Sequence, residues 1–156
     1  MDSRPSGVRN DVDPLGVTVL VAVLLLATAA GLVLRRRDGR LRDGRSVTGG
    51  WALAGRAPAD ADRVLLLQLS SPICTPCRRT TELIDELRTR RPGVAHHEID
   101  VAEQPDVART LGVLRTPTVV AFDRAGTELL RVSGVPRAAE LEAALDAALE
   151  PSPGTR

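Results

Sequence analysis

The feature that most limits the fold of this chain is a stretch of 20 residues without a charge, from Leu15 to Leu34. At 1.5 Å per residue, a helix of this length crosses a hydrocarbon core of about 30 Å. Asp13 and Pro14 precede the stretch, and three consecutive arginines, Arg35 to Arg37, follow it. A buried core helix is a poor alternative for a stretch of this length with no polar face. The sequence therefore predicts a transmembrane helix.

The arginines on either side of this span predict its orientation. Two arginines precede the span, and six follow it between Arg35 and Arg45. Because cytoplasmic loops carry the excess of basic residues, we expect a single-pass plasma-membrane protein with its C-terminal part in the cytoplasm. An extracytoplasmic domain is the alternative, since long C-terminal domains can override this rule. Ala27-Thr28-Ala29 also matches a signal-peptide cleavage pattern, but the arginine triplet is typical of a stop-transfer sequence.

The chain divides into five parts by composition. These are a tail (1–14), the span (15–34), a basic linker with the domain entry (35–62), a folded domain (63–150) and a second tail (151–156). Within the linker, Val47 to Leu53 could form a short strand. All the basic residues are Arg, which we attribute to a GC-rich bacterial genome. Trp51 and Phe122 are the only aromatic residues, so nucleic-acid bases have few side chains on which to stack, and we expect no nucleic-acid partner.

The pattern of the folded domain alternates between strands and helices. The apolar run from Val64 to Leu69 is typical of a strand buried on both faces. A helix from Cys77 to about Arg91 follows, and Pro92-Gly93 ends it. We expect further elements at 94–101 (strand), 106–111 (helix), 118–122 and 128–132 (strands joined by a turn) and 137–149 (helix). The order β-α-β-α-β-β-α predicts one α/β domain, a mixed sheet with helices on both faces.

The only two cysteines, Cys74 and Cys77, lie where the first strand turns into its helix. A C-x-x-C at this place indicates a dithiol/disulfide couple. At a helix start, unpaired N–H groups and the helix dipole favour a thiolate on the first sulfur. A metal site that adds His96 and His97 is a weaker interpretation, because adjacent residues of a strand point to opposite faces. We therefore expect no metal ion.

Two motifs together resemble the thioredoxin superfamily. The C-x-x-C turn is one, and Gly112 to Thr118, which looks like the family's cis-proline loop before an apolar strand, is the other. The element order is also similar, and the resemblance covers residues 63–149. Smaller similarities are Ile99-Asp100, Gln104-Pro105 and Val132-Ser133-Gly134.

The resemblance implies a membrane-anchored thioredoxin-like fold and thiol–disulfide oxidoreductase activity. It makes Cys74 the nucleophile, Cys77 the resolving cysteine and Pro117 the cis-proline. No cofactor beyond the redox-active disulfide is implied. The partners would be protein thiols and disulfides, together with an upstream reductant or oxidant. The surface that contacts the substrate would include Thr116, Ile73, Thr75 and Pro76.

The chain departs from the family pattern at two positions beside the cysteines. Ile73 stands where the family usually has Trp, and Gln68 stands where it has a buried acid that assists deprotonation of the second cysteine. Gln cannot take up a proton in that role. His96 falls where many relatives carry a buried lysine, so we expect it to lie near Gln68 and to relay the proton. The alternative is a binding or scaffold module with weak or no redox turnover.

Overall fold

The computed structural model describes residues 14–37, 41–43 and 47–149, so the predictions for residues 1–13 and 151–156 lie outside the described part. The chain forms two compact units, residues 1–37 and 38–156. The described part of the first unit is the helix α1 (Pro14–Arg37), of which Pro14–Val33 is a candidate membrane span by length and composition. The Thr18 and Thr28 hydroxyls donate to carbonyls one turn earlier, at 2.8 and 2.7 Å. The helix thereby pairs these polar groups internally, as a membrane-spanning helix would need to.

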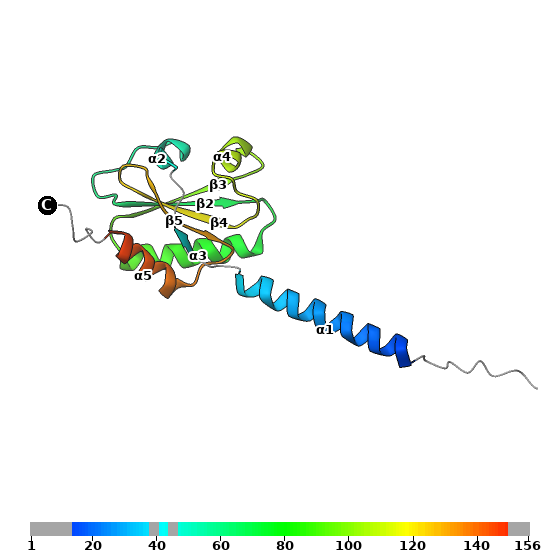
Figure 1. The fold of residues 1–156 in the computed structure, drawn as a ribbon. Coiled ribbons are helices and arrows are strands. Elements are labelled where there is room, and N and C mark those ends of the chain that lie inside the picture. Colours follow the sequence, from blue (N-terminus) through cyan, green and yellow to red (C-terminus); the bar gives the residue numbers. More distant parts are fainter. Residues whose placement is uncertain (1–13, 38–40, 44–46, 150–156) are drawn as a thin grey trace, which may run out of the picture. The chain divides into compact units, whose positions relative to one another are not determined.

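The second unit is built on a mixed five-stranded sheet with helices on both faces. Helices α2 and α4 cover one face, and α3 and α5 cover the other (Figure 1). In sequence order the elements are β1 (Leu41–Asp43), α2 (Gly50–Leu53), β2 (Val64–Ser70), α3 (Thr75–Arg90), β3 (Val94–Asp100), α4 (Pro105–Thr110), β4 (Thr118–Asp123), β5 (Glu128–Ser133) and α5 (Ala138–Leu149). The predicted α/β architecture is confirmed.

Strand β2 occupies the inner part of the sheet, whose strand order is β1-β5-β4-β2-β3. It pairs in parallel with β3 and antiparallel with β4, and all seven of its residues are buried. This burial explains why the sequence of β2 is a continuous apolar run rather than an alternating one. Because β2 leads directly into α3, the turn between them is held by the most buried strand of the domain.

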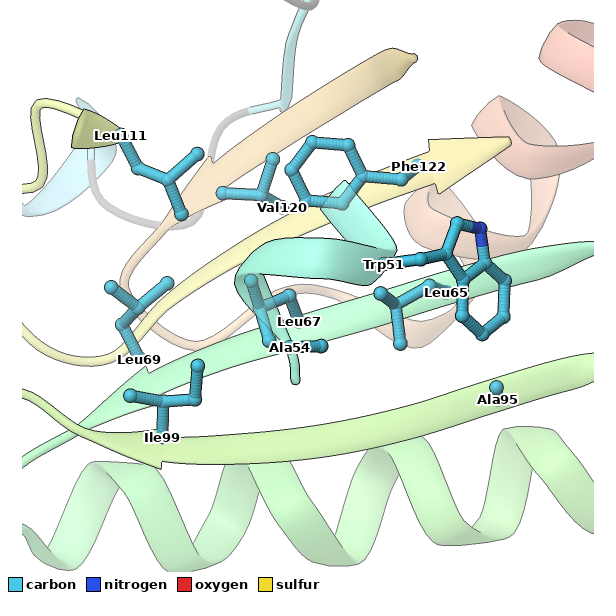
Figure 2. Packing of buried hydrophobic residues seen from close by; sticks show 10 residues of the cluster. All are labelled: Trp51, Ala54, Leu65, Leu67, Leu69, Ala95, Ile99, Leu111, Val120 and Phe122. Carbon is cyan, nitrogen blue, oxygen red and sulfur yellow. The ribbon is translucent and has the colours of Figure 1, made fainter. Parts of the chain in front are cut away.

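Apolar side chains form one core on each face of the sheet. Figure 2 shows the core on the face covered by α2, in which Trp51 and Phe122 lie among aliphatic side chains. The other core, between the sheet and α3 and α5, is aliphatic throughout; its members are Val64, Leu66, Ile84, Leu87, Val119, Ala121, Leu130, Val132, Leu141 and Leu145. Burial from both sides holds the sheet as a rigid support for the loops at its ends.

The predicted strand at Val47 to Leu53 is wrong, because the structure has the short helix α2 there. Trp51 is 5% exposed, and its indole N–H donates to the Asp123 carbonyl at 2.8 Å. Gly50 lies against the ring of Phe122, where a Cβ atom would come within 2.1 Å of a ring carbon. A helical turn places the indole of Trp51 in the core and keeps the backbone of Gly50 close to the ring of Phe122. The linker also contributes β1, an edge strand antiparallel to β5 that sequence patterning did not indicate.

Candidate active site

The two cysteines lie at the junction of β2 and α3 and form a disulfide bond. Cys74 is the N-cap of α3, in an extended conformation with φ −134° and ψ 93°. Its Sγ accepts a hydrogen bond from the Cys77 N–H at 3.2 Å. Pro76 occupies the first turn of α3, where its missing N–H would have no partner within the helix. The first sulfur therefore lies where backbone donors favour negative charge.

The two sulfurs differ in their exposure. Cys74 is partly exposed, whereas Cys77 is only 2% exposed. Cys77 is buried because it shares one helical face with Thr80, Ile84 and Leu87, which pack against the sheet. One sulfur can therefore meet a partner protein while the other is shielded beneath it.

The Thr116-Pro117 loop lies beside the cysteine turn. The Thr116–Pro117 peptide bond is cis, and the Thr116 hydroxyl is 3.1 Å from the hydroxyl of Ser71, three residues before Cys74. The Pro117 carbonyl accepts from the Gly134 N–H at 2.8 Å, which ties this loop to the segment that follows β5. The fold therefore brings the two motifs of the sequence together.

Apolar side chains are exposed around this junction. Ile73 and Leu114, which precede Cys74 and Thr116 in their loops, are 99% and 98% exposed. A pocket next to Thr116 extends this surface; it is lined by Val101, Pro105, Ala108, Arg109, Val113, Leu114, Arg115 and Thr116. Thr75 and Pro76 are also exposed. These residues form a largely apolar rim near the disulfide.

Gln68 is fully buried below the cysteines, in a group of polar side chains. Its Nε2 lies 3.2 Å from the Cys77 carbonyl oxygen and 3.1 Å from Glu98 Oε1. The hydroxyls of Ser70 and Thr81 are each 2.9 Å from the same nitrogen. The Thr81 hydroxyl also donates to Glu98 Oε2 at 3.2 Å. A carboxylate from β3 is thus hydrogen-bonded to the residue beneath Cys77.

His96 lies on the same face of β3 as Glu98, two residues earlier, but it is paired with α3. Its Nδ1 is 3.8 Å from Asp85 Oδ1, and its Nε2 is buried with no hydrogen-bond partner among the described residues. Burial lowers the pKa of His96 below its ordinary value, against the opposing effects of Asp85 and Glu98. The hydrogen bonds around Gln68 reach Glu98 and not His96, so the relay role of His96 stays a prediction.

Sequence reasoning did not identify Glu98. Gln68 and Glu98 are register partners in the parallel pair of β2 and β3, and this register cannot be read from either segment alone. One signal was present: in a strand, residues two apart share a face, so a prediction that points His96 toward Gln68 also points Glu98 there. Within the described residues, no group of three or more His, Cys, Asp or Glu side chains is placed to hold a metal ion.

Comparison with known proteins agrees with this geometry. Residues 54–149 match the family model of the thioredoxin-like domain. The chain belongs to the thioredoxin-like family. It is 31% identical to Thioredoxin H2 of Arabidopsis thaliana over 84 residues, 54% of this chain and 62% of the plant protein, which is less than two thirds of that relative's length. It is 30% identical to Thioredoxin-2 of Saccharomyces cerevisiae over 83 residues, 53% of this chain and 79% of the yeast protein.

A solved structure of a thioredoxin variant from Halobacterium salinarum is similar to this thioredoxin-like chain. The two structures have a TM-score of 0.53 and 26% sequence identity, and the match covers 59% of this chain and 80% of the Halobacterium protein. The match to the family model lies within the second unit of the chain, because it begins at residue 54. Among the described elements, α1, β1 and α2 precede the matched region.

Proposed function

We propose that this protein is a membrane-anchored thiol–disulfide oxidoreductase that exchanges disulfides with other proteins through Cys74 and Cys77. The observation that carries this proposal is the unequal exposure of the two sulfurs. Cys74 is accessible and receives an N–H hydrogen bond at the start of α3, whereas Cys77 is buried one helical turn further on. Disulfide exchange needs this arrangement, because one sulfur attacks the partner and the other displaces it.

The exchange reaction proceeds in two steps, formation of a mixed disulfide and its resolution. In the reducing direction, the Cys74 thiolate attacks a partner disulfide, one partner sulfur leaves as a thiolate, and a mixed disulfide forms. Cys77 then loses its proton and attacks Cys74 Sγ, which releases the second partner sulfur. The Cys74–Cys77 disulfide that results is the state of this structure. Two electrons pass to the partner, and an upstream reductant restores the dithiol. With an upstream oxidant, the same steps run in reverse.

The apolar rim is the surface on which we expect the partner protein to dock. Ile73, Thr75 and Pro76 surround the accessible sulfur, and Thr116 lies across from Ser71. A strand-like segment of the partner could pair with the Thr116 backbone and place its side chains against the rim. Because Ile73 replaces the family's usual Trp, the partners should differ from those of a general thioredoxin.

The apolar helix α1 supports membrane anchoring. With six arginines after the span and two before it, we propose that the catalytic domain faces the cytoplasm. A membrane-impermeant thiol reagent, applied to intact cells after mild reduction, tests this side. We expect no modification of Cys74 until the cells are permeabilised. Modification in intact cells would contradict the cytoplasmic orientation and favour an extracytoplasmic domain.

A trapping experiment tests the exchange chemistry itself. In Cys77→Ser, the resolving thiol is missing, so mixed disulfides between Cys74 and partner proteins should accumulate and disappear on addition of dithiothreitol. The matched Cys74→Ser variant keeps the buried thiol and should trap almost nothing. If neither variant traps a partner, the chain uses its fold as a binding module without redox turnover. If both variants trap equal amounts, Cys74 is not the specific nucleophile.

A further inference from the structure

With Gln68 in place of the family's buried acid, the resolving step lacks its usual proton acceptor. Cys77 must lose its proton before it can attack Cys74 Sγ, and at 2% exposure it has little direct access to bulk water. Gln68, which lies against its carbonyl group, is a neutral amide and cannot accept that proton. Some other group near Cys77 has to receive it.

Glu98 is a carboxylate that is hydrogen-bonded directly to Gln68. As register partner of Gln68 on the neighbouring strand, it reaches Gln68 Nε2 with Oε1 at 3.1 Å and the Thr81 hydroxyl with Oε2 at 3.2 Å. The Cys77 carbonyl and a carboxylate are both acceptors only, so they fix the amide with its N–H₂ group toward them. Both oxygens of the carboxylate are therefore held by side chains, Gln68 and Thr81, that also contact the Cys77 carbonyl. The residue is also exposed at the sheet edge, so a proton taken up there can pass on to solvent.

We propose that Glu98 accepts the proton of the Cys77 thiol in the resolving step, and that Gln68 and Thr81 are positioning residues that hold its carboxylate. The proton moves from Cys77 Sγ to the Glu98 carboxylate through a bridging water, the Cys77 thiolate displaces the partner sulfur from Cys74, and Glu98 then releases the proton to solvent. This inference rests on the proposed function and extends it from the pair of sulfurs to a residue of β3.

Other charged groups share this face and belong in the test. His96 stands two residues before Glu98, and Asp85 and Arg88 face it from α3. The salt-bridge contact of His96 runs to Asp85 at 3.8 Å, away from the Gln68 group. His96→Gln therefore tests the competing prediction, in which His96 itself relays the proton.

Stopped-flow reaction of the reduced, full-length protein with 5,5′-dithiobis(2-nitrobenzoate) separates the two steps. The first aromatic thiolate is released when Cys74 attacks, and the second when Cys77 resolves the mixed disulfide. For Glu98→Gln at pH 7, we expect the first release to be unchanged and the second to be slower by about a hundredfold, the lower range for a positioned base. The deficit should shrink as the pH rises, because hydroxide then removes the thiol proton without the help of a positioned base. Glu86→Gln, which removes the same charge from an exposed position of α3, should resolve at the wild-type rate.

The possible results distinguish a failure of the role proposed for Glu98 from a failure of the proposed exchange function. If the wild-type protein releases no second thiolate, the exchange function itself fails. If the wild type resolves normally and Glu98→Gln resolves equally fast at pH 7, only the role of Glu98 is overturned. A Glu98→Gln deficit that is the same at every pH would also overturn it, because a structural defect does not depend on the ionisation of Cys77. A deficit in His96→Gln that Glu98→Gln lacks would assign the role to His96.

Discussion

At the scale of single residues, Ile73 is the exposed side chain beside the cysteines that we propose contacts the partner protein. Its side chain is 99% exposed directly before Cys74 and touches the fold very little. An exposed aliphatic side chain costs nothing to desolvate and gains when a partner covers it. Its place therefore fits a docking role better than a packing role.

We expect Ile73→Ser to weaken exchange with protein disulfides selectively. Partial burial of this side chain in a complex is worth about 1 kcal/mol, so kcat/KM for a protein substrate should fall roughly fivefold. A small aromatic disulfide, which needs no docking surface, should react at the wild-type rate. Parallel assays with both substrates measure the difference. An equal loss on both would show that Ile73 shapes the cysteine turn, and no loss on either would remove it from the docking surface.

His96 makes the stability of the domain depend on pH. Burial lowers its pKa in the folded state below the ordinary value of 6.5, so below that pH the unfolded chain binds the extra proton more readily. The stabilising contribution is therefore present above about pH 6.5 and is lost as the pH falls through the lowered pKa. Urea unfolding between pH 7.5 and 5 should show a smaller loss of stability for His96→Gln than for wild type. Identical losses would mean that His96 titrates as it does in the unfolded chain.

The cysteines and the polar group beneath them differ in how far the sequence could predict them. Cys74 and Cys77 could be identified because their spacing and their place after an apolar run can be read from one short segment of the sequence. The contact of Gln68 with Glu98 depends on how two strands pair, and 30 residues separate the partners in the chain. The sequence indicated the missing acid at Gln68, and the structure was needed to find a carboxylate next to it.

At the scale of elements, α2 is a single helical turn that closes one face of the sheet. Its position depends on Gly50, whose backbone N–H donates to the Gly126 carbonyl at 3.0 Å while its α-carbon lies against Phe122. The sequence indicated β2 by its continuous apolar run and α3 by the helical spacing of its buried side chains. It could not indicate α2 or β1, which are four and three residues long and are held by contacts from distant segments.

Gly50→Ala should destabilise the domain by about 1–3 kcal/mol, because the added methyl group would overlap the ring of Phe122 and force it to move. Chemical denaturation measures the change. Combining Gly50→Ala with Phe122→Leu, which makes room, should cost less than the sum of the two single variants. Additive costs would show that the two residues are not in contact in the folded protein.

At the scale of the whole molecule, the chain joins an apolar helix to a thioredoxin-like domain that carries its own two cores. The apolar stretch could be predicted from its length without a charge. The order of the elements could be predicted from the alternation of strand and helix patterns along the domain. The first part of the second unit did not follow such a pattern, and there the structure adds β1 to the edge of the sheet next to β5. Anchoring would restrict the exchange reaction to partners at or near the membrane surface.

The most direct test of the central claim is reduction of a protein disulfide by the full-length protein in detergent. With dithiothreitol as the electron source and insulin as the substrate, we expect wild type to accelerate the precipitation of the insulin B chain well above the uncatalysed rate. Cys74→Ser, which loses the accessible sulfur, should give only the uncatalysed rate. Equal rates for wild type and Cys74→Ser would contradict disulfide exchange through Cys74 and leave a thioredoxin-like fold that binds without reacting.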